Sequence, residues 1–130
     1  MLRGGPDQHG PVPADTTDER RRLRQRGQAL LDEAVADLEA LPGSSRRRMF
    51  GCEGLFASGR VVAFVDGEGA LVVKVPVGDA ADLVAAGAAT RVRMGRSPAR
   101  EWVAVPWGEE ALPLWQRLVH VSHAYVTAGA

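Results

Sequence analysis

The stretch that decides the fold is residues 47–75, RRMFGCEGLFASGRVVAFVDGEGALVVKV. Within it, short strand-like runs at 47–50, 54–57, 61–65 and 70–75 are separated by glycine-containing turns. Runs of this length between glycine turns are typical of β-strands. Because connections of a few residues join antiparallel neighbours, the stretch predicts a β-meander.

The run 61–65 has apolar residues on both of its faces. Val61, Ala63 and Val65 alternate with Val62 and Phe64, and a strand that is apolar on both faces is expected at the centre of a sheet and covered twice. The first and last helices can cover one face each. Alternatively, they can share a face and leave the other one for a partner chain.

A helix is predicted upstream of the meander. Thr16 and Glu19 form a capping-box pattern, and Pro42-Gly43 ends the helix. Arg20 and Arg24 fall on the same arc as the apolar residues, so the first turns are expected to overhang the body, since a buried unpaired arginine is unfavourable. The apolar residues of this arc are Leu23, Leu30, Leu31, Ala34, Val35, Leu38 and Leu41.

Downstream of the meander we expect a short helix over 79–86, capped by Asp79 and ended by Gly87. Strands are predicted over 90–94 and 101–105.

An amphipathic helix over residues 109–127 closes the chain. The fold class is therefore α+β: an antiparallel sheet of about five to six strands, long N- and C-terminal helices and one short internal helix. We expect a single domain over 16–130 behind a flexible tail at 1–15, where prolines and glycines are frequent.

Composition excludes several classes of protein. The chain has 130 residues and a formal net charge of +0, with 16 basic and 16 acidic residues, which argues against a protein attracted to nucleic acid by its total charge. The single cysteine, Cys52, excludes an internal disulfide and favours a reducing setting. No apolar run suits a membrane span and no secretory signal is visible, so we expect a cytoplasmic protein.

Two arginine runs stand out within the neutral total. One lies at the start of the first helix and the other lies after it, so we expect them about 30 Å apart at opposite ends of that helix. Solvated surface is one interpretation and nucleic-acid contact is the other. The candidate contact residues are Arg20, Arg21, Arg22, Arg24, Arg26, Arg46, Arg47 and Arg48.

No pattern in the sequence indicates a catalytic, metal or cofactor site. The glycines match neither the G-x-G-x-x-G nor the G-x-x-x-x-G-K-S/T spacing of phosphate-binding loops, and they are expected in turns. His120 and His123 are spaced to share a metal but lack neighbouring ligands, and Cys52 has no histidine beside it in the sequence. We therefore expect a protein that is not an enzyme and binds no cofactor.

The segment Met49-Phe50-Gly51-Cys52-Glu53-Gly54-Leu55-Phe56 resembles the N-terminal domain of the TfoX/Sxy family of bacterial competence regulators. The likeness spans about residues 28–127. Cys52 stands where the family usually has glycine, so a different turn geometry is expected there. The residues that carry the motif are Met49, Phe50, Gly51, Gly54, Leu55, Phe56, Gly59, Lys74, Pro106 and Trp115.

Competence regulators also carry a C-terminal helical domain, which has no counterpart among these 130 residues. The resemblance therefore implies a stand-alone N-terminal domain that acts as a regulatory module in bacterial transcription. We expect it to work through protein–protein contacts, with an unknown partner or with itself as a homodimer. The alternative is a nucleic-acid accessory protein that uses the arginine-rich start of the first helix.

Overall fold

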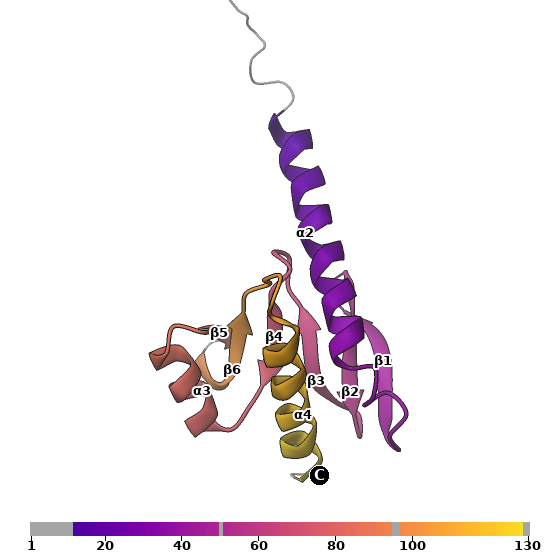
Figure 1. Cartoon of the computed structure of the whole chain (residues 1–130), viewed down its shortest axis with the longest axis vertical. Coiled ribbons are helices and arrows are strands. Elements are labelled where there is room, and N and C mark those ends of the chain that lie inside the picture. Colours follow the sequence, from indigo (N-terminus) through magenta and orange to yellow (C-terminus); the bar gives the residue numbers. More distant parts are fainter. Residues whose placement is uncertain (1–11, 50, 95–96, 129–130) are drawn as a thin grey trace, which may run out of the picture.

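The computed structural model of the chain describes residues 12–49, 51–94 and 97–128. Its strands form one antiparallel six-stranded sheet in the order β1-β2-β3-β4-β6-β5, which confirms the α+β class (Figure 1). In chain order the elements are α2 (Val12–Ala34), β1 (Ser44–Met49), β2 (Cys52–Ala57), β3 (Arg60–Val65), β4 (Leu71–Lys74), α3 (Val77–Ala85), β5 (Thr90–Met94), β6 (Ser97–Val105) and α4 (Leu112–Ala128).

The helices share one face of the sheet. Helices α2 and α4 pack against each other in front of the sheet, α2 on β2 and β3 and α4 on β3 and β4 (Figure 1). Helix α3 packs on β6, and its Leu83 lines the same hollow as Leu118 of α4. Of the two arrangements expected from the sequence, the structure has the one in which the helices share a face.

The core lies between this face and the helices. The strand residues that point to the helices are fully buried and lie opposite one another from strand to strand. Helices α2 and α4 fill the other side of the core with Leu31, Trp115, Leu118 and Val119. The buried strand residues of this face are Leu55, Ala63, Val65, Leu71, Val73, Val103 and Val105.

Helix α2 meets the β3–β4 turn backbone to backbone. A Cβ atom on Gly27 would collide with the carbonyl oxygen of Gly69, and one on Gly69 would collide with that of Leu23. Gly69 also has φ +85°, a conformation that favours glycine. This contact fixes where α2 crosses the sheet, and the first turns of α2 project beyond it (Figure 1).

Helix α4 satisfies an irregularity in β3. The register between β2 and β3 shifts between Leu55 and Phe56, so one residue of β3 has no partner in β2. The buried Ser122 hydroxyl of α4 donates a hydrogen bond to the Val62 carbonyl oxygen at 3.1 Å. A seryl side chain thus replaces a sheet partner inside the core.

The ends of the helices differ from those predicted. Helix α2 begins at Val12 rather than Thr16 and ends at Ala34 rather than Pro42. A proline in the first turn is tolerated because the donor it lacks has no intrahelical acceptor. Beyond Ala34 the chain continues in turns, with i→i−3 bonds such as that from the Leu38 amide to the Val35 carbonyl.

Asp79 does not cap the short helix. The N-cap is Pro76, which gives no side-chain bond, and Asp79 lies within the first turn of the helix. Gly87, with φ +76°, ends the helix as predicted. Strand β6 begins at Ser97 rather than Glu101 because its first residues continue the pairing with β5.

Helix α4 begins at Leu112 rather than at residue 109, after a turn in which the Ala111 amide bonds to Gly108. The predicted tail falls on residues 1–11, which lie outside the described residues, and on 12–15, which belong to α2. None of the described helices combines the length and apolar character needed to cross a bilayer.

Candidate interaction surfaces

The sheet face opposite the helices carries an apolar strip. Phe64, Val72 and Ala104 lie opposite one another across β3, β4 and β6. On the same face Trp102 lies opposite Lys74, and the Trp102 ring centroid is 6.3 Å from that of Phe64. Among the described residues no helix covers this strip, which we call the uncovered face.

The uncovered face continues onto β1 and β2. A Cβ at Gly54 would meet the sulfur of Met49 and the Cβ of Phe64, so both side chains close over this glycine. Next to them, the Arg47 guanidinium lies over the Phe56 ring, 4.8 Å from its centroid. Phe64 and Val72 are only 5% and 1% exposed, so Trp102 and Ala104 are the partly exposed residues of this strip.

The charged strand residues of the uncovered face are basic. Arg47, Lys74 and Arg100 belong to it, and Arg100 stands two positions before Trp102 in β6, whereas at the Ala104 end Asp66 and Glu68 line the adjoining cavity. The acidic residues of the described strands, Glu53 and Glu101, point to the helix side, where Glu101 accepts a hydrogen bond from a tyrosine of α4. The strand residues of the face are therefore apolar in its middle and, where charged, basic.

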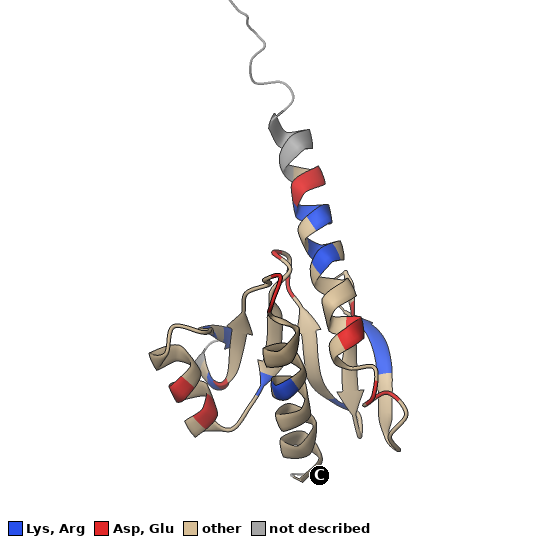
Figure 2. Cartoon of the chain, viewed as in Figure 1, with Lys and Arg blue, Asp and Glu red and all other residues tan. Residues whose placement is uncertain are grey.

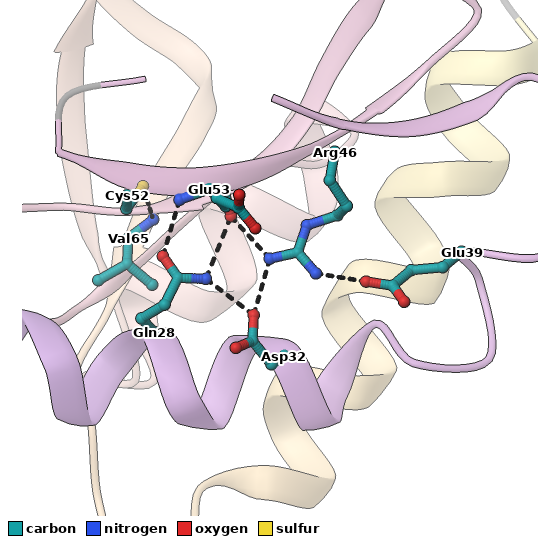
Figure 3. Close-up of polar contacts among 7 residues, drawn as sticks. All are labelled: Gln28, Asp32, Glu39, Arg46, Cys52, Glu53 and Val65. Carbon is teal, nitrogen blue, oxygen red and sulfur yellow. Dashed lines mark hydrogen bonds and ion pairs between the residues drawn. The ribbon is translucent and has the colours of Figure 1, made fainter. Parts of the chain in front are cut away.

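The arginine runs predicted from the sequence do not act as a unit. Arg46 is bound within the fold: its guanidinium forms ion pairs with Asp32 and Glu39 and donates to the Glu53 carbonyl oxygen at 2.9 Å (Figure 3). Burial disfavours the charged form, but the bonds to the carboxylates outweigh it and raise the pKa of Arg46. Its side chain is 18% exposed, so it contacts an external anion only if these pairs break.

Gln28 completes this network, a role that no pattern in the sequence indicates. Its amide nitrogen donates to the Glu53 carbonyl oxygen at 3.2 Å, while its amide oxygen accepts from the Glu53 amide at 2.8 Å (Figure 3). It also donates to Asp32 at 2.8 Å. An amide side chain of α2 therefore pairs with the backbone of β2 and attaches the helix to that strand.

The arginines of α2 lie on two sides of the helix. Arg20 and Arg26 line an open cavity of about 610 Å³, where Arg26 lies 3.7 Å from the ring centroid of Trp107. Arg21 and Arg24 instead line a hollow of about 300 Å³ on the side of β1. The run is thus split by the helical period.

The two arginine runs meet at the β1–β2 turn, against the expected separation of about 30 Å. That expectation is wrong for Arg48, because β1 runs back alongside α2 (Figure 2). A Cβ at Gly51 would lie 3.7 Å from the Arg24 Nε atom, and Arg24 and Arg48 both act electrostatically on Cys52. Arg22 is exposed.

Cys52 is a buried residue of β2 rather than a strained turn residue. Gly51 takes the left-handed φ of +81°, and Ser58 is the non-glycine residue with positive φ in the described chain, so the different geometry expected at Cys52 is absent. Burial raises the pKa of the Cys52 thiol, although the bond from the Val65 amide and nearby arginines act against it. A thiol with a raised pKa is a poor nucleophile.

The two histidines of α4 bind different groups. His120 contacts Asp37 at 2.9 Å through Nε2 and the Gln116 carbonyl oxygen at 2.6 Å through Nδ1. His123 contacts the Ser44 hydroxyl at 3.1 Å. Within 12–49, 51–94 and 97–128 no three His, Cys, Asp or Glu side chains gather around a point that could hold a metal.

Most residues of the family motif serve the core or the turns of the fold. Leu55 and Trp115 are in the core, and the Trp115 indole donates to the Pro106 carbonyl oxygen at 3.3 Å. Gly59, with φ +79°, forms the β2–β3 turn. Phe50 lies outside the described residues. The motif residues on the uncovered face are Met49, Gly54, Phe56 and Lys74.

Comparison with known families gives one clear match. Residues 36–119 match the TfoX N-terminal domain, which covers β1–β6 and the first half of α4 but not α2. A search of curated proteins finds no match. The match covers more than half of the chain and follows the motif on which the sequence resemblance rests, so the chain belongs to the TfoX N-terminal domain family.

Proposed function

We propose that this protein is a non-enzymatic regulatory module of the bacterial cytoplasm that binds a partner protein on the uncovered face of its sheet. The observation that carries the proposal is the one-sided packing of the helices. Among the described residues no helix covers this strip, in which Phe64 and Val72 are buried and Trp102 is partly exposed. A partly exposed tryptophan beside apolar strand residues and a charged rim is typical of protein interfaces.

The charge of this face supports an acidic partner rather than a second copy. A two-fold dimer through this face would use the same surface of both chains, so Arg47, Lys74 and Arg100 would find no acidic strand residue on the opposing face. Like charges brought together in an interface are unfavourable. An acidic segment of another protein would be attracted by all three.

Non-enzymatic function is supported by the state of the groups that usually perform catalysis. Cys52 is buried with a raised pKa. His120 and His123 contact Asp37 and Ser44 within the fold. A role in the regulation of transcription is drawn from the family alone.

The test starts from affinity capture in nuclease-treated lysate, followed by purification of the captured protein and titration calorimetry with the wild-type chain. Lys74→Glu and Trp102→Ala should each weaken binding at least about tenfold, and Lys74→Glu should also reduce the dependence of affinity on salt. The matched control is Arg117→Glu, an exposed charge reversal on α4, which should leave the affinity unchanged.

Equal affinity of wild type, Lys74→Glu and Trp102→Ala would show that the partner binds elsewhere. Light scattering adds a second criterion. If the wild-type chain is a dimer and Trp102→Ala dissociates it, the uncovered face binds a second copy of the chain rather than an acidic partner.

A further inference from the structure

The hollow beside α2 is lined by arginine and glutamine side chains and by one glycine. Its walls are Arg21, Arg24, Gln25 and Gln28 from one side of the helix and Gly51 from the β1–β2 turn. The hollow has a volume of about 300 Å³ and is open to solvent. No apolar side chain and no carboxylate is among these lining residues.

Arg24 is the central group of this hollow. It is half-buried between α2 and the turn, and no described residue gives its guanidinium a hydrogen bond or an ion pair. Arg21, one turn earlier, has a loose pair with Asp18 at 3.6 Å, and both side chains are more than half exposed. Such an exposed pair contributes little and exchanges easily for another anion.

The acidic residues around the hollow do not neutralise it. Asp32 and Glu39 are held by Arg46. Glu53 lies opposite Arg48 in the register of β1 and β2 and is exposed. No carboxylate of the described residues forms an ion pair with Arg24, so its positive charge remains at the turn.

The chemistry of the site favours phosphate over a protein surface. Guanidinium groups bind phosphate through paired N–H donors, and the contact needs no apolar neighbour. A protein interface, in contrast, is built around apolar or aromatic anchors, which this hollow lacks.

The shape of the molecule favours a long polyanion. Helix α2 projects past the edge of the sheet (Figure 1), so a nucleic-acid backbone can follow its side without meeting the strands. We propose that the Arg21–Arg24 hollow, with Arg48 beside it, binds the backbone phosphates of nucleic acid without reading the sequence. Arg26 and Arg46 take no part, because Arg26 stacks on Trp107 and Arg46 is held by carboxylates.

The site lies on the helix side of the sheet and is therefore separate from the uncovered face. Arg21 and Arg24 also precede the residues that match the family. Binding of nucleic acid is thus independent of the partner-binding function proposed above.

The experiment measures fluorescence anisotropy of labelled mixed-sequence duplex DNA and of a labelled single strand at low salt, over a series of salt concentrations. The wild-type chain should bind, and the triple variant Arg21→Ala/Arg24→Ala/Arg48→Ala should bind at least about tenfold more weakly. On duplex DNA, the salt slope should fall by about 0.9 for every phosphate that the variant no longer binds. The matched control, Arg60→Ala/Arg91→Ala/Arg117→Ala, removes the same charge from exposed sites elsewhere and should bind as the wild type does.

Two further probes, inorganic phosphate and polyglutamate, distinguish binding of nucleic acid from binding of free phosphate or of an acidic polypeptide. At equal ionic strength, inorganic phosphate should compete with DNA more strongly than chloride does. Labelled polyglutamate should bind the wild type and the triple variant equally. Thermal unfolding of both triple variants shows that they are folded.

Three results would overturn the proposal: no binding of either DNA by the wild type at low salt, equal weakening in the control triple variant, or a larger loss of polyglutamate binding than of DNA binding. Binding to inorganic phosphate without binding to DNA would also reject nucleic acid as the ligand. None of these results depends on the partner protein, so this proposal and the proposed function fail separately.

Discussion

At the scale of single residues, Gly27 decides how closely α2 approaches the sheet. Its backbone lies directly on the carbonyl group of Gly69, and the same glycine of the turn touches the Leu23 carbonyl. Both sides of this contact are backbone, which does not move aside as a long side chain would. The position of α2, and with it the place of the arginines, depends on the absence of one methyl group.

Gly27→Ala should therefore lower the free energy of unfolding by about 1–3 kcal/mol, the usual range for overpacking, although alanine favours a helix. Urea unfolding followed by circular dichroism measures the change. Gly78→Ala is the control, because Gly78 lies in α3 and a Cβ there meets nothing within 4 Å. It should raise stability or change it by less than about 1 kcal/mol. Equal effects of the two substitutions would mean that α2 does not rest on the turn.

Arg46 acts at the same scale by joining Asp32, Glu39 and the Glu53 carbonyl group. Arg46→Ala should cost about 1–2 kcal/mol in urea unfolding, since the carboxylates are about half exposed and are solvated when released. Arg46→Lys should recover only part of this, because one ammonium group lacks the guanidinium fork. Arg60→Ala, at an exposed position, should change stability by less than about 0.5 kcal/mol. If Arg46→Lys were as stable as the wild type, the guanidinium fork would not be what joins these groups.

At the scale of elements, α4 is attached to the connection between α2 and β1. His120 contacts Asp37 and His123 contacts Ser44, so two residues one turn apart hold two points of the same connection. The Gln116 carbonyl group raises the pKa of His120, burial opposes it, and the bond to Asp37 adds to the increase. Protonation of His120 thus strengthens the attachment of α4.

The sign of the pH effect follows from that raised pKa. The contribution of His120 is fully present below the unfolded pKa of about 6.5 and is lost as the pH rises through the higher folded pKa. The wild type should exceed His120→Gln in unfolding free energy most at acid pH, and the difference should shrink above neutrality. Urea unfolding of both proteins across this range is the measurement. His123→Gln, whose partner is an uncharged hydroxyl, serves as control. A difference that grows towards alkaline pH would refute the assignment.

Elements with local signals could be predicted from the sequence, and those set by distant contacts could not. The strand runs and the turns at Gly51, Gly59 and Gly69 follow from residue type, because these positions need a positive φ. The end of α2 at Ala34 does not, since tight turns continue the apolar pattern beyond the helix. Asp79 is of a residue type that commonly caps helices, but it lies inside the first turn.

At the scale of the whole molecule, the candidate sites are products of topology. The sequence indicated the arginines but not their grouping, which arises because β1 turns back along α2, so that Arg48 lies near the end of the strand and Arg24 reaches the turn that follows it. An uncovered face was one of the two arrangements that the sequence left open, and the neighbouring strands of Phe56 and Phe64 follow from the meander. The place of Trp102 beside Phe64 could not be predicted, because the sheet order alone brings β6 next to β4.

The projecting start of α2 gives a prediction at this scale. Deletion of residues 1–18 should change the free energy of unfolding by less than about 0.5 kcal/mol, as expected for exposed sites, because residues 17–22 are exposed. Deletion of residues 1–27 should destabilise the protein far more, since it removes Leu23 and the contact of Gly27 with the turn. Thermal unfolding of both truncated chains distinguishes these outcomes. A large loss of stability from the shorter deletion would mean that the projecting turns belong to the packed body.

The place of β6 between β4 and β5 has a consequence for biosynthesis. Strands β1 to β4 pair with their sequence neighbours, whereas Leu71 of β4 also pairs with Val105 of β6. While the chain leaves the ribosome, the apolar edge Leu71–Lys74 stays open until β6 has emerged and inserted. An open edge of this kind can pair with other chains. The time between the synthesis of β4 and β6 is therefore the interval in which a nascent chain is most exposed to misassembly, and the last strand to be made is the one that completes the sheet.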